Sequence, residues 1–98
     1  MEPWADRVEQ WAVDRNLIAG SSPAKQLKKL LEEIGELATA VAEYDLDEIQ
    51  DGIGDASVVM RIMAAQCGLN FDECLERAWN EIKDRKGKVI DGVFVKED

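Results

Sequence analysis

The chain has 98 residues, 46% of them hydrophobic, which fits one domain with one core and excludes a two-domain protein. Twenty-one acidic residues against twelve basic ones give a net charge of −9, which argues against a general nucleic-acid binder because phosphates repel such a surface. The chain contains no histidine, so Ser-His-Asp triads, Cys-His dyads and imidazole metal sites are excluded.

Apolar residues at helical spacing predict four helices. The first runs from about Trp4 to Asn16. The second has Ser22 as its N-cap and Pro23 at its first position, and it ends at about Tyr44. Its apolar stripe is the widest in the chain and consists of Leu27, Leu30, Leu31, Ile34, Leu37, Ala38 and Val41.

Two capping boxes predict where the next helices begin, Asp45 with Glu48 and Asn70 with Glu73. The third helix is expected to bury Ile49, Ile53, Ala56, Val59, Met60 and Met63. The fourth is expected to bury Phe71, Cys74, Leu75, Ala78, Trp79 and Ile82. After Arg85, two short β-prone runs around residues 91–92 predict a hairpin or an extended arm.

These elements predict an all-α four-helix bundle that forms a single domain over residues 1–98. The two cysteines, Cys67 and Cys74, lack C-x-x-C spacing, and we expect them to behave as small hydrophobic residues. No secretion signal is recognisable, and no apolar run approaches the roughly 20 residues that span a bilayer. We therefore expect a cytoplasmic protein without a membrane partner, located in the host cytoplasm if a phage encodes it.

Three glutamates of the second helix, Glu32, Glu33 and Glu36, project within about 100° of one another. An acidic face of this kind is commonly just solvated, and Lys28 and Lys29 lie near it. The short connection at residues 44–46 places the second and third helices antiparallel, so these glutamates can meet acids of the third helix across the packing groove.

On the third helix, Asp51 and Asp55 share a line that continues as Val58 and Ile62. Acids on a line that turns apolar are expected to face another element, where they need a partner or a cation. Glu48 lies on the same side, but its capping role explains it. Because every available ligand is a hard oxygen, the expected cation is Mg²⁺, with Mn²⁺ as a substitute.

Basic residues gather at the end of the fourth helix, where Lys83, Arg85, Lys86 and Lys88 follow Asn80. They can complement the carbonyl end of the helix, or they can clamp a phosphate. Together with the acids they suggest a metal-bridged phosphate ligand. The three tryptophans, Trp4, Trp11 and Trp79, have the helical spacing of core residues, although one of them could border a pocket.

The order Glu32-Glu33-x-x-Glu36, then acids ending at Asp55, then Asn80-x-x-Lys83-x-Arg85, resembles MazG-like nucleotide pyrophosphohydrolases, whose signature is EExxE…ExxD. The resemblance covers roughly residues 26–98 and is greatest to small phage-encoded members. It implies an all-α enzyme, a homodimer or homotetramer, that cleaves a nucleoside triphosphate between its α and β phosphates. A nucleoside monophosphate and pyrophosphate would be the products.

Carried onto this chain, the resemblance implies metal ligands at Glu33, Glu36 and Asp55, and a catalytic pair at Glu32 and Glu33. Glu32 would be a ligand or the base that activates water. Phosphate contacts are implied at Asn80, Lys83 and Arg85. The chain departs from the signature at one position, because the glutamate of ExxD falls on Gly52, and Asp51 is our substitute ligand.

The base-binding residues are not readable from the sequence, and Asn16, Gln26 and Trp11 are our candidates. A phage setting favours a purine deoxynucleotide such as dGTP, in phage nucleotide metabolism. Two alternatives stay open. One is an acidic helical interaction module without catalysis, and the other is a pyrophosphohydrolase for dUTP or a phosphoribosyl nucleotide.

Overall fold

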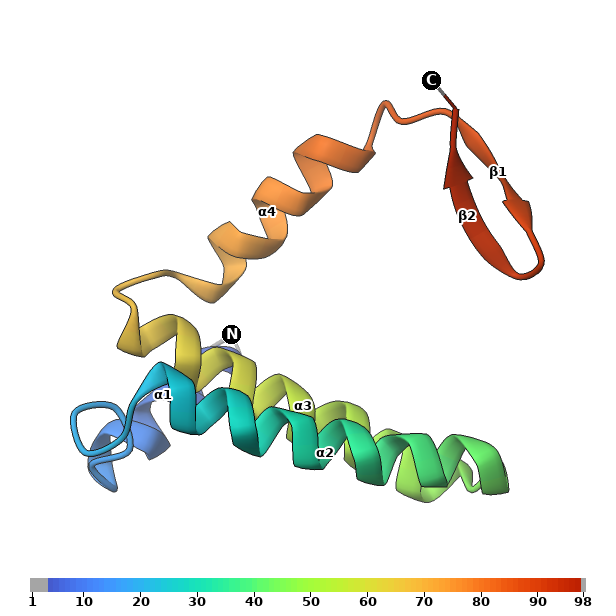
Figure 1. Ribbon diagram of the computed structural model, residues 1–98. Coiled ribbons are helices and arrows are strands. Elements are labelled where there is room, and N and C mark those ends of the chain that lie inside the picture. The colour runs from blue at the N-terminus through green and yellow to red at the C-terminus, as the bar shows by residue number, and fades with distance from the viewer. Residues whose placement is uncertain (1–3, 98) are drawn as a thin grey trace.

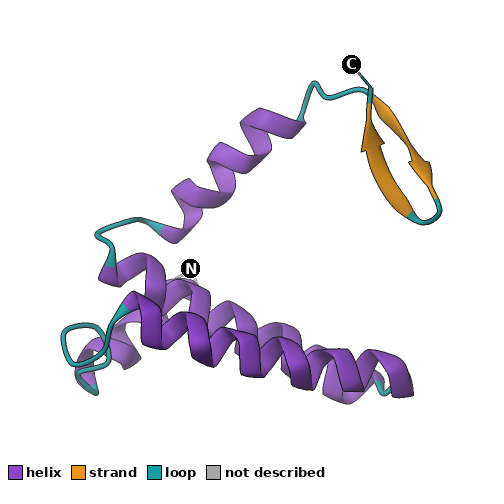
Figure 2. Ribbon diagram, viewed as in Figure 1, coloured by secondary structure: helices purple, strands orange, loops and turns teal. Residues whose placement is uncertain are grey.

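A computed structural model describes residues 4–97, which form four helices and a two-stranded hairpin (Figure 1, Figure 2). The elements are α1 (Trp4–Asp14), α2 (Pro23–Glu43), α3 (Leu46–Gln66), α4 (Phe71–Ile82), β1 (Gly87–Ile90) and β2 (Val93–Lys96). The predicted all-α fold class and the C-terminal hairpin are confirmed. The first helix ends two residues before the predicted Asn16, which lies in the turn that follows with a positive φ of 58°.

Caps fix the ends of the two long helices. Ser22 Oγ accepts a hydrogen bond from the Lys25 amide at 3.2 Å, and Asp45 Oδ1 accepts one from the Glu48 amide at 3.2 Å. The other half of the predicted capping box is wrong, because the Asp45 amide donates to Ala40 O at 3.0 Å instead. With only two residues between them, α2 and α3 run antiparallel and side by side (Figure 1).

The core between α1, α2 and α3 is built mainly from small side chains, namely Ala12, Ala40, Ala56, Val59, Ile62 and Ala64. The predicted leucine stripe of α2 is largely outside it, with Leu31 64% exposed and Ile34 46% exposed. Ile53 and Met60 of α3 are also exposed, contrary to prediction. These helices approach through small residues, which leaves the larger apolar side chains on the outer surface.

Helix α1 is tied to α3 by a buried arginine. Arg61 Nη2 donates to Asp6 Oδ1 at 2.8 Å and to Glu9 Oε2 at 3.0 Å, and the arginine side chain is only 5% exposed. Charged groups at such depth are retained where carboxylates pair with them. This contact fixes α1 across the face of α3.

Helix α4 and the hairpin form an arm (residues 71–97) that rises away from the three-helix body (Figure 1). No residue of α4 is buried, and Trp79 is 57% exposed. The prediction that the three tryptophans lie in the core is wrong, since Trp4 and Trp11 are exposed too. The hairpin turns at Asp91 and Gly92, which both have the positive φ that a type I′ turn requires, 51° and 80°.

Candidate functional site

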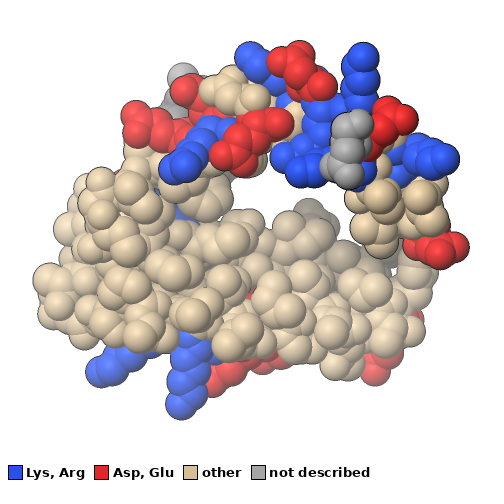
Figure 3. Space-filling view, turned by 45° about the horizontal axis from the view of Figure 1, so that its top comes forward, with Lys and Arg blue, Asp and Glu red and all other residues tan. Residues whose placement is uncertain are grey.

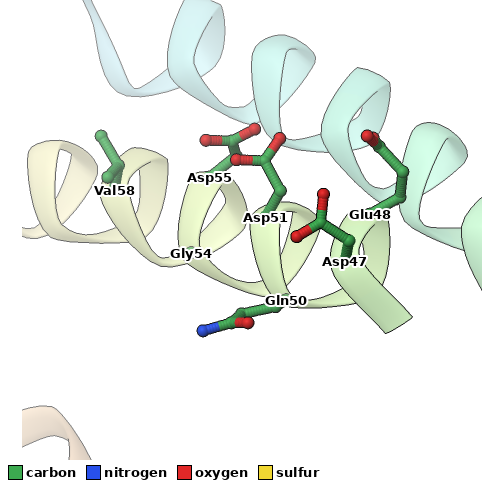
Figure 4. A pocket seen from close by; sticks show the side chains of 7 residues that line it. All are labelled: Asp47, Glu48, Gln50, Asp51, Gly54, Asp55 and Val58. Atoms are coloured by element: carbon green, nitrogen blue, oxygen red, sulfur yellow. The ribbon is translucent and has the colours of Figure 1, made fainter. Parts of the chain in front are cut away.

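A groove of about 770 Å³ follows one side of α3 and is lined mainly by carboxylates. In Figure 4 the side chains of Asp47, Glu48, Asp51 and Asp55 all extend toward the side on which α2 lies, whereas Gln50 points away. The predicted pair Asp51 and Asp55 is therefore brought together on one face of α3. Val58 continues this line and is half-buried, as predicted.

Helix α2 contributes Glu33, which is buried with 7% of its surface exposed. The predicted acidic face of α2 is thus not simply solvated, because at Glu33 it turns inward. Glu32 and Glu36 are exposed on either side of it. The helix buries a carboxylate while Leu31 stays outside, which is the reverse of what amphipathic patterning predicts.

The two helices share one electrostatic cluster. Burial raises the pKa of the Asp55 carboxyl above its ordinary value, and the negative charges of Asp51 and Glu33 raise it further, against a smaller opposing effect of Lys29. Glu33 on α2 therefore acts on Asp55 of α3. Like charges held this close are costly unless a cation balances them.

Lys29 is the cation within reach of this cluster in the described structure. Its Nζ lies 3.2 Å from Glu33 Oε1 and 3.8 Å from Glu32 Oε2. The hydrogen bond to Glu33 raises the pKa of Lys29 above its ordinary value, and the charges of Glu33, Glu32 and Glu36 act in the same direction. Lys29 is thus paired with Glu33 and Glu32 and lies within the electrostatic influence of Glu36.

The donor set suits a hard divalent cation. The second oxygen of Glu33, Oε2, is buried and has no hydrogen-bond donor among the described residues, so it keeps a lone pair available for a ligand. All neighbouring candidates are carboxylates, which Mg²⁺ prefers. Within residues 4–97 no three acidic or cysteine side chains converge as a preassembled metal centre, so metal binding requires them to draw closer.

The residues proposed to contact phosphate lie elsewhere. Asn80 and Lys83 are at the end of α4, and Arg85 follows in the turn before the hairpin, all three exposed. Basic side chains gather on the arm, across an open gap from the body (Figure 3). A separate groove of about 440 Å³ on the arm contains Arg85 together with Glu97. Within one chain the structure does not bring these residues to the carboxylates of α3.

The three candidate base-binding residues do not form one pocket. Trp11 lines a cavity of about 350 Å³ between α1 and α3, beside Val58. Asn16 lies in the turn after α1, with its side chain next to Gly20, and Gln26 donates a hydrogen bond to Ser21 Oγ at 3.0 Å. Of the three, Trp11 is the one that lines a cavity bordering the carboxylate groove, through the shared Val58.

Comparison with known proteins places this arrangement in a family. The model of the MazG nucleotide pyrophosphohydrolase domain matches residues 21–90, which is more than two thirds of the chain and includes α2, α3, α4 and β1. The chain belongs to the MazG family. The resemblance read from the carboxylate pattern is confirmed.

The chain is also similar to a phage protein. It is 51% identical over 70 residues to an uncharacterized 18.2 kDa protein in the rep-hol intergenic region of Haemophilus phage HP1. That similarity covers 71% of this chain and 42% of the phage protein, so the chain spans less than half of its relative. No solved structure matches the chain. No helix formed by residues 4–97 is both long enough and apolar enough to cross a bilayer.

The structure gives a physical reason for the one departure from the MazG signature. Gly52, at the position of the ExxD glutamate, is buried against α2, and a Cβ there would lie 3.0 Å from Leu37 Cδ1 and 3.3 Å from Leu37 Cβ. A side chain here requires Leu37 to shift, and a glutamate would bring a charge into the contact between the helices. Asp51 instead extends into the groove beside Asp55 (Figure 4).

Two groove residues were missed by sequence reasoning, Asp47 and Glu48. Glu48 was assigned to a capping role that its side chain does not have, because the amide it would cap bonds to Ala40. A usable signal was present in the spacing, since Asp47, Asp51 and Asp55 recur every four residues and so share one helical face.

Proposed function

We propose that this MazG protein is a Mg²⁺-dependent nucleoside triphosphate pyrophosphohydrolase that cleaves between the α and β phosphates, yielding a nucleoside monophosphate and pyrophosphate. The observation that carries the proposal is the shared cluster of Glu33, Asp51 and Asp55 in a chain whose family is defined by nucleotide pyrophosphohydrolase domains. Mn²⁺ is expected to substitute for Mg²⁺.

Four carboxylates would hold the cation, Glu33, Glu36, Asp51 and Asp55. Glu33 already offers an unpaired oxygen, and Asp51 and Asp55 already face the same groove. When bound, Mg²⁺ supplies charge neutralisation for the triphosphate and acidifies coordinated water. Glu32, exposed beside Glu33, would either bind the cation as a further ligand or act as the base that orients the attacking water and accepts its proton. Lys29 binds the other oxygen, Oε1, and so leaves Oε2 of Glu33 available to the cation.

Asn80, Lys83 and Arg85 would contact the phosphates, and this requires a second copy of the chain. In one chain they stand on the arm, apart from the groove. The same arm exposes Leu75, Trp79 and Ile82, and α2 exposes Leu31 and Ile34, so both carry apolar surface that association would cover. We therefore propose a homodimer or homotetramer in which the arm of one copy lies over the groove of another.

The proposed substrate is a free nucleotide rather than nucleic acid, since the chain has a net charge of −9. A purine deoxynucleotide such as dGTP is the first choice, and the similarity to a phage protein supports a role in phage nucleotide metabolism in the host cytoplasm. A panel of canonical and modified nucleotides, including dUTP and a phosphoribosyl nucleotide, tests this choice.

The same panel tests the activity itself. Wild-type protein with Mg²⁺ is expected to release pyrophosphate. Glu36→Gln or Asp55→Asn is expected to reduce turnover by more than about 100-fold, because loss of a residue that only positions a metal ligand typically reduces activity by about 10- to 100-fold. Glu43→Gln, which neutralises an exposed acid at the end of α2, is the matched control and should keep activity. A protein inert on the whole panel would favour the acidic interaction module.

A further inference from the structure

A second cavity opens on the side of α3 next to the carboxylate groove. It measures about 310 Å³, which is within the usual range for small-molecule sites. Helices α1 and α3 and the first residue of α4 line it, mainly with apolar and aromatic groups. Its lining includes Trp4, Val8, Ser57, Val58, Arg61 and Phe71.

This cavity adjoins the carboxylate groove directly. Both are lined by Gly54 and Val58, which lie one helical turn apart on α3. A Cβ on Gly54 would have no neighbouring atom within 4 Å, so open space remains at the boundary between them. A ligand with phosphates among the carboxylates can therefore place its other end in the apolar cavity.

Arg61 gives this cavity a specific hydrogen-bond donor. The residue is 4% exposed, and its Nη2 is used by Asp6 and Glu9, but its Nε is buried with no acceptor among the described residues. Buried donors are almost always paired, so an unpaired one beside a cavity indicates a missing acceptor. The guanidinium carbon also lies 5.9 Å from the centre of the Phe71 ring.

A nucleobase is the ligand fragment that matches these features. Its flat face can pack on the aromatic rings of Trp4 and Phe71, and its ring carbonyl oxygens are hydrogen-bond acceptors. Guanine, uracil, thymine and cytosine carry such a carbonyl, whereas adenine does not. A small shift of the Arg61 side chain, which lines the cavity, would bring its buried Nε–H to the carbonyl, because Asp6 and Glu9 bind Nη2 and not Nε.

We propose that the cavity between α1 and α3 receives the base of the nucleotide and that Arg61 Nε selects a base with a ring carbonyl over adenine. This inference rests on the proposed function and adds the specificity-determining residue. It also gives Trp11, which lines the adjoining cavity with Trp4 and Val8, a place at the edge of the base site.

Binding of nucleoside monophosphates without metal tests this assignment independently of catalysis. Titration calorimetry should show GMP bound about 10- to 100-fold more tightly than AMP, the range of one charge-assisted hydrogen bond. GMP should exceed 2-aminopurine riboside monophosphate, which lacks the carbonyl, by a similar factor. Equal affinities for GMP and these two ligands in the wild-type protein would overturn the proposal.

Variants at Arg61 and Gly54 test whether the preference for GMP arises in this cavity. Arg61→Lys keeps a positive charge for Asp6 and Glu9 but removes Nε, and it should bring the ratio of GMP to AMP affinity close to one. Gly54→Leu should weaken all monophosphates by at least tenfold, whereas Gly35→Leu, on α2 and equally open around its Cβ, should not. Circular dichroism confirms that each variant is folded, and the ligand comparison stands without any variant.

Parallel hydrolysis assays separate the two hypotheses. Turnover of triphosphates with no preference among the monophosphates would overturn the base assignment and leave the proposed function standing. The expected binding preference without turnover of any triphosphate would support the base site and overturn the hydrolase.

Discussion

Asp55 lies half-buried between the negative charges of Asp51 and Glu33, and its raised pKa follows from that position. A group that is harder to ionise in the folded state than in the unfolded chain destabilises the fold once it is charged. The cluster thus reduces stability in the metal-free protein. A bound cation would remove that penalty, which is why Asp55 is a sensitive probe of the site.

Asp55→Asn is therefore expected to raise the melting temperature of the metal-free protein at neutral pH. In the wild-type protein, the Asp55 contribution favours folding below the ordinary aspartate pKa of about 3.9 and is lost as pH rises through the higher pKa of the folded state. Asp55→Asn should not lose stability in this way as pH rises. Melting temperatures of both proteins from pH 3 to 8 measure the difference, and a variant less stable than wild type at pH 7 would contradict the prediction.

Gly52 shows a different residue-scale constraint, because its place against Leu37 sets how closely α2 and α3 approach. Restoring the family glutamate with Gly52→Glu should destabilise the fold by about 2 kcal/mol or more, since it overpacks the contact and buries a charge. Gly54→Glu, with open space around its Cβ, is the control and should fold normally. Urea denaturation compares the two, and equal stability would refute the packing argument.

At the scale of elements, a buried cation of α3 contributes to the docking of α1. Arg61 is buried, whereas the side chains of its partners Asp6 and Glu9 are 50% and 38% exposed. Solvent screens the two carboxylates and so weakens both ion pairs. The arginine, however, cannot reach water unless α1 moves.

The double variant Asp6→Asn with Glu9→Gln should destabilise the protein by about 2 kcal/mol, less than the 3–5 kcal/mol of a fully buried pair because both acids are partly solvated. Hydrogen exchange should rise first in α1. Asp14→Asn, at the far end of the same helix, serves as the comparison. Unchanged protection of α1 in the double variant would show that apolar contacts alone hold it.

Helix boundaries were predictable because caps act locally. Ser22, Asp45 and Asn70 each accept the amide bond expected of an N-cap, and the positive φ values at residues 91–92 follow from Asp-Gly. The face of α2 that packs inward was not predictable in the same way. Glu33 is buried and Leu31 is exposed because α2 and α3 pack through Gly52 and alanines, and the periodicity of one helix does not encode such tertiary contacts.

The candidate site was predictable in part for the same reason. Spacing alone put Asp51 and Asp55 on one face, where the structure has them. The role of Arg61 depends on contacts more than 50 residues apart in sequence with Asp6 and Glu9, and no local pattern marks them.

At the scale of the whole molecule, the chain exposes more apolar surface than a protein of this size normally leaves uncovered. Helix α4 has no buried residue, and Leu75, Trp79 and Ile82 all stand open on the arm. A second copy that covers the arm and α2 would bury these side chains. It would also supply Asn80, Lys83 and Arg85 to a groove that lacks cations other than Lys29 among the residues described here.

The purified chain is therefore expected to be a homo-oligomer by analytical ultracentrifugation, and Trp79→Glu should weaken association at least 100-fold. Burial of a large apolar side chain contributes about 2–3 kcal/mol, and a symmetric interface counts it twice. Arg77→Gln changes the net charge equally on the opposite side of α4 and should leave association intact. A monomeric wild-type protein at high concentration would contradict the proposed assembly.

The most direct test of the central claim, that carboxylates of α2 and α3 form a pyrophosphohydrolase centre, is a ³¹P NMR time course of the nucleotide panel with Mg²⁺. The account predicts that pyrophosphate and nucleoside monophosphate grow in equal amounts with the wild-type protein, and that neither grows with Asp55→Asn. Orthophosphate with nucleoside diphosphate, turnover undiminished in Asp55→Asn, or no change for any nucleotide would contradict it.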